Sequence, residues 1–328
     1  MSNQLEWQHL HKRAFRAMGC QMTVWLELEH SHTASTLLAA AEGMFRDAER
    51  RLSRFDPSSE LSQVNSRPGK WTRTSETLWT VLTQALSMAR ETGGLFDPTQ
   101  LTALEAAGYT CSFEQLPAVV GGLPDVETAA NRLNQWQTIQ LDGDKQSIWL
   151  PPGVKLDLGG IAKGYTAQQA VRYLSDWGPG LVDAGGDLTA GEAPWGWPGW
   201  PVAISAPFSF MKEQATELVP LWLVQGTMAT SGVDYRRWQH NGRAAHHVID
   251  PRTSLPAETD LLTVTVLARE AVRAEAWSTA SLAAGSADAQ QRLTRNNLAA
   301  ALVDQLGNLH LTPALASFLD VNVQQAHM

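Results

Sequence analysis

A lysine that closely follows a pair of glycines is the strongest chemical signal in this sequence. Residues 156–164 alternate leucines with polar residues, pass through Gly159 and Gly160, and reach Lys163 as helical spacing begins. Adjacent glycines let the backbone approach a ligand closely because no Cβ stands in the way. The free N–H groups of a first helical turn suit a phosphate, and Lys163 would add a positive charge. The pattern is compatible with a phosphate site, but taken alone it is more often an ordinary strand-to-helix turn with Lys163 in solvent.

Two imidazoles, a carboxylate and a guanidinium lie close together in residues 246–253. In a strand that ends at Pro251, His247 and Ile249 would share one face, and Asp250 would lie on the other. His247 and Asp250 are therefore candidates for proton transfer that need not touch each other. A structural histidine followed by an Asx turn at Asp250 explains the same residues equally well.

Oxygen-bearing side chains at two further places could have a function or could be purely structural. Glu275 and Thr279 are four residues apart on a predicted helix, so a carboxylate and a hydroxyl project from one face. With a backbone carbonyl they make an all-oxygen set that suits magnesium, although most such pairs on helices have no function. In residues 94–99, Pro98 would hold Asp97 extended and Thr99 could cap the next helix. The competing interpretation is a helix–loop–helix connection in which Asp97 only forms a turn.

Hydrophobic spacing predicts the elements that must position these residues. Helices are predicted at residues 33–54, 75–91, 126–133, 161–177 and 270–284, followed by a final helix and strand pair. Strands are predicted at residues 14–30, 136–141, 147–150, 156–158, 181–183, 202–205, 218–224, 228–231, 246–250 and 262–267. Helices and strands interleave, but hairpins join many neighbouring strands, which predicts an α+β fold over a purely parallel sheet.

Composition narrows the class of protein. The chain has 328 residues and a net charge of −8 without a basic run, which argues against general nucleic-acid binding. No window approaches the ~20 apolar residues of a membrane span. The two cysteines, Cys20 and Cys111, form no disulfide framework. The first residues lack the apolar region of a signal peptide or a lipobox, so we expect a cytoplasmic protein. We expect residues 1–14 to be an extension and residues 15–328 to form one domain, which two intertwined subdomains could build.

Eight segments, in this order, resemble the FAD:protein FMN transferases, also called ApbE-type flavin transferases. Any one segment would be a weak signal, but their common order over residues 15–285 is a strong one. They are residues 17–19; 52–56 with 59–62 and 65; 92–99; 157–165; 185–188; 229–232; 247–253; and 275–280.

The resemblance implies an α+β enzyme with an FAD cleft between two subregions. With Mg²⁺ it would transfer FMN to a Thr or Ser hydroxyl of an acceptor protein through a phosphoester bond and release AMP. The resemblance implies FAD contacts for Met18, Phe55, Phe96, Asp97, Pro98, Asp157, Lys163, His247 and Val248. It implies magnesium ligands at Gly160, Glu275, Ser278 and Thr279, and a catalytic charge at Lys163. His247 and Asp250 are the candidates for the catalytic base.

Some positions depart from the family's pattern. Glu275 replaces the usual Asp and is one methylene longer, which alters the distance to a bound magnesium ion. Cys20, Phe55 and Ser254 replace a Thr, a Tyr and a Gly, and none of these changes removes a charge. We therefore expect an active enzyme. Two alternatives are an FAD pyrophosphatase that forms FMN and AMP and a non-catalytic FAD-binding protein.

Thirteen tryptophans suggest aromatic contacts with a flavin, but their positions favour other roles. We expect Trp195 and Trp197 to pack within a loop or to form an exposed acceptor-docking surface, and Trp200 to be structural. The sequence does not identify the acceptor protein or the oligomeric state.

Overall fold

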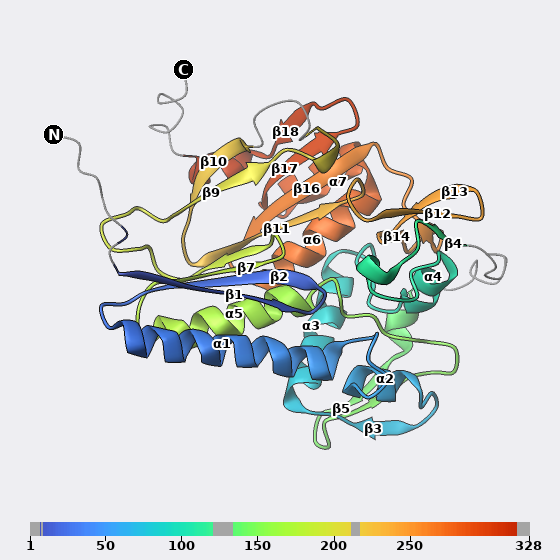
Figure 1. Ribbon diagram of the computed structural model, residues 1–328. Helices are drawn as coiled ribbons and strands as arrows, with labels where there is room; N and C mark the ends of the chain where they lie inside the picture. Colours follow the sequence, from blue (N-terminus) through green and yellow to red (C-terminus); the bar gives the residue numbers. More distant parts are fainter. Residues whose placement is uncertain (1–6, 8, 121–133, 211–216, 320–328) are drawn as a thin grey trace.

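An eight-stranded sheet, antiparallel throughout, forms the centre of the chain in the computed structural model (Figure 1). The structure describes residues 7, 9–120, 134–210 and 217–319. In spatial order the strands are β1 (Leu10–Ala17), β2 (Cys20–Glu27), β7 (Gly180–Ala184), β8 (Leu188–Ala190), β11 (Gly226–Gly232), β16 (Leu261–Ala268), β17 (Ala299–Asp304) and β18 (Leu309–Leu311).

Helices cover one face of this sheet and a hairpin covers the other (Figure 1). The helices are α1 (Ser31–Leu52), α5 (Ala162–Ser175), α6 (Ala271–Ala284) and α7 (Ser286–Arg295). Apolar residues recur along one side of α1 and pack on β1 and β2, as helical periodicity requires. On the opposite face, the hairpin of β9 (Trp200–Ser205) and β10 (Glu217–Leu223) packs on the sheet with η5 (Pro313–Phe318).

Smaller elements gather beside the sheet and enclose its helical side. One group contains α2 (Glu60–Asn65), α3 (Glu76–Glu91), η3 (Gln135–Thr138) and a small sheet of β3 (Trp71–Arg73), β6 (Ser147–Trp149) and β5 (Gln140–Asp142). A second contains α4 (Leu101–Ala106), η1 (Phe113–Gln115), β4 (Val119–Val120), β12 (Arg237–His240) and β13 (Arg243–His246). Two short pieces, β14 (Ile249–Asp250) with β15 (Leu255–Pro256) and η4 (Phe208–Phe210), complete the described elements.

The hairpin between β1 and β2 has a two-residue turn of Met18 and Gly19. Both residues have positive φ, 51° and 71°, which matches the right-handed twist of a tight hairpin. Positive φ is unfavourable for a non-glycine residue. The Met18 N–H donates to Glu49 Oε1 at 2.7 Å, which helps to hold this conformation.

Most of the predicted elements are confirmed. Helices predicted at residues 33–54, 75–91, 161–177 and 270–284 are α1, α3, α5 and α6, and the final helix and strand are α7 and β17. The α+β class is confirmed by the mixture of helices and antiparallel sheets. The helix predicted at residues 126–133 falls outside the described residues.

Several predictions about strands were wrong. Residues 14–30 do not form one strand, and most of them belong to the hairpin of β1 and β2. Its first strand begins at Leu10, inside the segment expected to be an extension. Residues 135–138 form a 3-10 helix, so only Gln140–Asp142 of that segment is a strand. The strand predicted through residues 246–250 is interrupted, because His247 and Val248 lie between β13 and β14.

The buried segment at residues 156–158 is extended but belongs to no sheet. The Asn65 side chain satisfies both backbone groups of Leu156, with N···O distances of 2.9 and 2.7 Å. The Asp157 N–H donates to the Pro98 carbonyl at 2.8 Å. Single side chains and carbonyls therefore replace a neighbouring strand, which hydrophobic spacing could not predict.

Within the described ranges, no helix is long and apolar enough to cross a membrane.

Candidate active site

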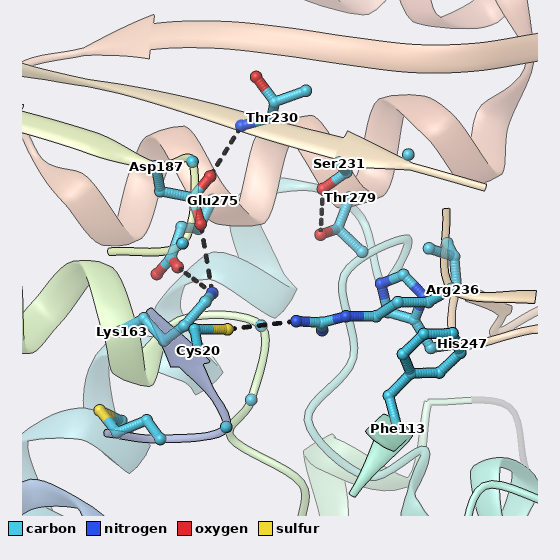
Figure 2. A pocket seen from close by; sticks show the side chains of 18 of the residues that line it. Cys20, Phe113, Lys163, Asp187, Thr230, Ser231, Arg236, His247, Glu275 and Thr279 are labelled. Atoms are coloured by element: carbon cyan, nitrogen blue, oxygen red, sulfur yellow. Dashed lines mark hydrogen bonds and ion pairs between the residues drawn. The ribbon is translucent and has the colours of Figure 1, made fainter. Parts of the chain in front are cut away.

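One cavity of about 1180 Å³ collects most of the residues that the sequence singled out (Figure 2). It lies where the β1–β2 turn, the start of α5, the β7–β8 turn, β11, the β13–β14 connection and α6 meet. The predicted residues that line it are Met18, Phe55, Phe96, Asp97, Asp157, Gly160, Lys163, His247, Val248, Glu275, Ser278 and Thr279. Pro98 and Asp250 are not among its lining residues.

The glycine turn before α5 is shaped by the side chain of Asp157. Asp157 Oδ1 accepts a hydrogen bond from the Gly159 N–H at 2.7 Å, as in an Asx turn. A Cβ at Gly159 would lie 3.0 Å from that same oxygen, so the turn leaves little room for a side chain. Asp157 Oδ2 also pairs with Arg54 Nε at 2.7 Å. Asp157 therefore fixes the turn that carries Lys163 into the cavity.

Lys163 lies between two carboxylates in the cavity (Figure 2). Its Nζ is 3.1 Å from Glu275 Oε1 and 3.2 Å from Asp187 Oδ2. The second Glu275 oxygen, Oε2, accepts from the Gly164 N–H at 3.0 Å, and Asp187 Oδ1 accepts from the Thr230 N–H at 2.9 Å. The ammonium group is thus held at one point by α6, by the β7–β8 turn and by β11.

The charges of this cluster are strongly coupled. Burial disfavours the charge on Lys163, but the Glu275 and Asp187 carboxylates together raise its pKa above the usual value. Burial raises the pKa of Glu275 to about 7, although Lys163 lowers it and Asp187 adds to the rise. One ammonium therefore faces two buried or nearly buried carboxylates, which leaves the cluster short of positive charge.

Three hydroxyls meet beside this cluster. Ser231 Oγ on β11 lies 2.8 Å from Ser278 Oγ and 3.0 Å from Thr279 Oγ1 on α6. Ser278 Oγ also donates to the Glu275 carbonyl at 2.9 Å. In the part of the chain that the structure describes, no three His, Cys, Asp or Glu side chains are grouped to hold a metal. A cation at this site would therefore depend on hydroxyl and backbone oxygens as well as carboxylates.

His247 faces Lys163 from the opposite side of the cavity (Figure 2). Its Nδ1 is buried without a hydrogen-bond partner, and its ring makes an edge contact with Tyr109. Burial lowers the pKa of His247 to about 3, and the charges of Arg236 and Lys163 contribute to this shift. The imidazole is therefore neutral at physiological pH and can accept a proton.

Arg236 extends across the cavity from the connection between β11 and β12. Figure 2 shows its guanidinium pointing toward Cys20, whose Sγ lies 3.3 Å from Arg236 Nη2. Both side chains line the cavity, and both cysteines of the chain are free. Arg236 thus places a second positive charge within the cavity.

Residues 96–100 pack against the glycine turn at residues 157–160. Asp97 accepts hydrogen bonds from the Thr99 N–H at 2.8 Å and from Gln100 Nε2 at 3.1 Å. Burial raises the pKa of Asp97, while its bond from the Thr99 hydroxyl lowers it. The Phe96 ring would lie 3.1 Å from a Cβ at Gly160, so the ring touches the glycine backbone. Pro98 supports Asp157 through its carbonyl and does not reach the cavity.

Phe55 forms an exposed wall at the cavity's edge. It is 41% exposed, and the Arg54 guanidinium lies 4.0 Å from its ring centroid. Arg54 Nη1 donates to the Tyr109 carbonyl at 2.9 Å, while Nη2 is buried without a partner. Phe55 can therefore present a flat apolar face to a ligand over a well-anchored cation.

The contacts of Asp250 are those of a structural residue. It binds Arg252 in a bidentate pair, with Nε–Oδ1 and Nη2–Oδ2 distances of 2.9 Å. Arg252 Nη2 also donates to the Ala283 carbonyl at the end of α6, at 2.8 Å. The pair joins the β14 loop to α6, and the predicted Asx turn is present because Asp250 Oδ1 accepts from the Arg252 N–H.

Among the cavity residues that sequence reasoning overlooked, Asp187, Ser231 and Arg236 contact predicted site residues or add charge to the cavity. Asp187 and Ser231 lie within segments noted for their order, and each follows or precedes a glycine in a tight connection. None of the three has a spacing that marks it as functional, because its partners come from distant parts of the chain. Trp195 and Trp197 do not line the cavity, and Trp197 stacks on Trp7.

Comparisons with known proteins agree with this arrangement. The family model described as the ApbE family matches residues 18–303. A FAD:protein FMN transferase of Haemophilus influenzae is 31% identical over 84% of this chain and 81% of that protein. A FAD:protein FMN transferase of Salmonella typhimurium is 29% identical over 82% of this chain and 77% of its own length.

Solved structures share the fold. The crystal structure of the apbe protein from Thermotoga maritima matches with a TM-score of 0.84 and 25% identity, over 95% of this chain and 99% of that one. The flavinyl transferase ApbE of Pseudomonas stutzeri, in its apo form, has a TM-score of 0.80 at 24% identity and shows the same fold over 94% of this chain and 96% of its own.

Proposed function

This chain belongs to the ApbE family, and from that membership and its site we propose that it transfers FMN from FAD to a hydroxyl of an acceptor protein. The observation that carries the proposal is the position of Lys163. Its ammonium lies at the first turn of α5, between Asp187 and Glu275, in the cavity that also holds His247. A helix start and a fixed cation together favour a bound diphosphate.

The cavity offers separate surfaces for the parts of FAD. We assign the diphosphate to Lys163 and the first turn of α5, and the nucleotide's polar groups to Asp97 and Asp157. The flat walls suit the rings. They are formed by Met18, Phe55, Phe96, His247 and Val248. Because Asp157 and Asp97 are already bonded to their own turns, they would act mainly by shaping these surfaces.

Lys163 would stabilise the charge that develops during transfer. When the acceptor hydroxyl attacks the FMN phosphorus, a P–O bond to the acceptor forms and the phosphoanhydride bond to AMP breaks. AMP leaves with the electron pair of that bond. Negative charge spreads over the phosphoryl oxygens, so a preorganised ammonium in a partly buried site lowers the barrier. Arg236 adds a second cation in the same cavity.

The side chains beside Lys163 also carry the kind of ligand atoms that Mg²⁺ prefers. Magnesium prefers oxygen ligands, and this site holds the Glu275 carboxylate and the Ser278 and Thr279 hydroxyls, with Gly160 in the same cavity. The burial that raises the pKa of Glu275 indicates a carboxylate short of positive charge. When bound, the ion would neutralise the phosphate oxygens and assist the departure of AMP.

His247 is our candidate for the base. Its neutral imidazole can take the proton of the acceptor hydroxyl, and the unpaired Nδ1 leaves one ring nitrogen available. An anionic diphosphate nearby would raise its pKa from about 3 toward the working pH. Asp250 would act indirectly, because its bidentate pair with Arg252 fixes the loop that follows His247.

A direct assay tests the proposal. The full chain is incubated with FAD, Mg²⁺ and a candidate acceptor domain that contains a reactive Thr, with the Thr→Ala acceptor as the control. We expect flavin fluorescence to stay with the acceptor on a denaturing gel, and none with the control. Steady release of AMP without an acceptor would favour an FAD pyrophosphatase. Tight FAD binding without turnover at any Mg²⁺ concentration would favour a non-catalytic binding protein.

A further inference from the structure

A free strand edge borders the cavity. In the described part of the chain, β9 pairs only with β10, and no backbone hydrogen bond joins β9 to another element. Ala203 and Ser205 of β9 line the cavity, as do the residues that follow them up to Phe208. An unpaired strand edge presents backbone donors and acceptors to any extended chain that reaches it.

The register shows which backbone groups face outward. Ala203 lies opposite Pro220. In an antiparallel ladder, opposed residues either exchange two hydrogen bonds or exchange none. Proline has no N–H, so Ala203 and Pro220 form a pair of the second kind. The N–H and C=O of Ala203 therefore point away from β10. The register shifts between Glu217 and Val219, so the extra residue lies on β10 and β9 keeps its own alternation. The N–H and C=O of Ser205 therefore point the same way as those of Ala203. Two outward donors and two outward acceptors thus lie beside the cavity.

An aromatic rim adjoins this edge. We use the name for Phe113, Phe208 and Tyr235, which all line the cavity. The Tyr235 ring centroid lies 5.2 Å from that of Phe208 and 5.9 Å from that of Phe113. Tyr235 is 60% exposed and Phe208 is 49% exposed. Phe113, His247 and Arg236 are all labelled in Figure 2 and all line the cavity, so the rim and the catalytic groups border the same space.

We propose that the acceptor protein docks as an extended segment, which pairs with the β9 edge at Ala203 and Ser205 and packs its side chains on the aromatic rim. The inference rests on the proposed function, because the reaction requires a foreign hydroxyl to reach this cavity. An extended chain on this edge presents alternate side chains to one face. The reactive hydroxyl would then enter beside His247 while its neighbours contact the rim.

The chemistry of this surface favours a peptide over other occupants. N–H and C=O groups that recur along a strand edge match the repeat of a polypeptide backbone. A lipid chain has no such groups, and a flavin ring has them on its pyrimidine edge alone. Exposed aromatic side chains that gather at one place are typical of protein-binding surfaces. Edge and rim together therefore select a polypeptide whose side chains are partly apolar.

Four variants of the full chain test the surface. Tyr235→Ala and Phe208→Ala each remove one ring of the rim, with Trp177→Ala, an equally exposed ring outside the cavity, as the control. Ala203→Pro removes one outward N–H of the strand edge, and Trp177→Ala serves as its control as well. Each variant is assayed for FMN transfer to the acceptor domain and for FAD binding by fluorescence titration.

We expect each rim variant and Ala203→Pro to raise the KM for the acceptor about ten-fold. The Kd for FAD should not change, and Trp177→Ala should have the wild-type KM. Weaker FAD binding in the rim variants would overturn the inference, because the rim would then hold the flavin. Wild-type KM in all variants would also overturn it, while the proposed function would stand. Failure of the wild-type chain to transfer FMN would overturn both.

A second measurement avoids substitutions. A synthetic peptide that spans the acceptor's reactive Thr is added to the FAD-bound chain, and amide hydrogen exchange is followed. We expect slower exchange at residues 203 and 205, whose N–H groups would become hydrogen-bonded. Unchanged exchange at both positions under saturating peptide would contradict the pairing, whatever the variants show.

Discussion

Lys163 carries the central charge in the proposed reaction, and its surroundings accommodate the Glu at position 275. The longer side chain brings one carboxylate oxygen to the Lys163 ammonium and the other to the Gly164 N–H. With Asp187 on its other side, Lys163 is fixed before any ligand binds. Preorganisation of this kind reduces the cost of ordering a catalytic charge.

Replacement of Lys163 by Ala removes this charge. We expect turnover to fall roughly 10²–10³-fold, the usual loss for one preorganised electrostatic contact, and FAD to bind more weakly. Steady-state AMP release and fluorescence titration measure the two effects. Lys155→Ala is the control, because Lys155 pairs with Glu105 and does not line the cavity. Turnover equal to that of the control would contradict the assigned role.

His247 predicts a specific dependence of stability on pH. Its pKa is lowered to about 3 in the folded chain, whereas an unfolded histidine titrates near 6.5. As the pH falls below about 6.5, the unfolded state therefore binds a proton that the folded state does not. At pH 5 this lowers the free energy of unfolding by about 2 kcal/mol relative to pH 7.5.

Urea unfolding of the wild-type chain and of His247→Gln at both pH values measures this contribution. We expect the wild-type chain to lose about 2 kcal/mol more than the variant between pH 7.5 and pH 5. Above pH 7, the free energy of unfolding of the two proteins should depend on pH in the same way. Equal losses in both proteins over this range would show that His247 is not buried as a neutral imidazole.

The elements of the site could be predicted from sequence to different degrees. The long helices carry regular apolar spacing, so they were predicted well. Two of them, α3 and α6, also end close to glycines with positive φ, Gly93 and Gly285. Residues 156–158 were mistaken for a strand because burial and extension look alike in a sequence. The partners that satisfy this segment, Asn65 and Pro98, lie far away in the chain.

The contacts between elements could not be predicted from local patterns. The Lys163–Asp187–Glu275 cluster joins three segments that are distant in sequence, and Arg236 reaches Cys20 from another. Motif order indicated that most of these segments belong together, but it did not indicate which atoms meet. Pairing depends on tertiary packing, which spacing within one element does not encode.

The packing of α5 against α6 leaves room only for glycine at position 164. A Cβ there would lie 2.5 Å from Glu275 Oε2 and 3.2 Å from the Ala271 Cβ. We expect Gly164→Ala to lower the free energy of unfolding by about 1–3 kcal/mol and to displace Glu275, which lowers turnover. Urea unfolding and AMP release measure both.

Gly43→Ala is the matched control for this prediction. Gly43 lies inside α1, and beyond the adjacent residues and backbone of that helix no atom lies within 4 Å of an added Cβ. Alanine in a helix is favoured over glycine by about 1 kcal/mol, so this variant should be as stable as the wild-type chain or more stable. Wild-type stability and turnover in Gly164→Ala would show that α5 and α6 are packed less tightly than described.

At the scale of the whole molecule, the cavity is lined by segments from distant parts of the chain. Its lining runs from Arg16 on β1 to Thr279 on α6 and includes the β9 hairpin on the far face of the sheet. The central sheet holds these segments together, since its strand order places β1 and β2 next to β7 and β8. A ligand in the cavity therefore contacts most layers of the molecule at once.

Ligand binding should consequently stabilise the entire fold. FAD at 100 times its Kd should add about 2.7 kcal/mol to the free energy of unfolding, measured as a rise in Tm by calorimetry. Riboflavin, which lacks the diphosphate, should give a smaller rise at equal concentration, because it cannot contact Lys163. An equal rise with riboflavin would contradict the assignment of the diphosphate to that residue.

The central claim is that one cavity transfers FMN from FAD to an acceptor hydroxyl, and the ratio of the two products tests it most directly. AMP is quantified by chromatography and flavin-bearing acceptor by intact mass, in the same reaction with FAD and Mg²⁺. We predict one AMP for each acceptor modified, and no modification of an acceptor whose reactive Thr is replaced by Ala. AMP that accumulates while the acceptor stays unmodified would contradict the account.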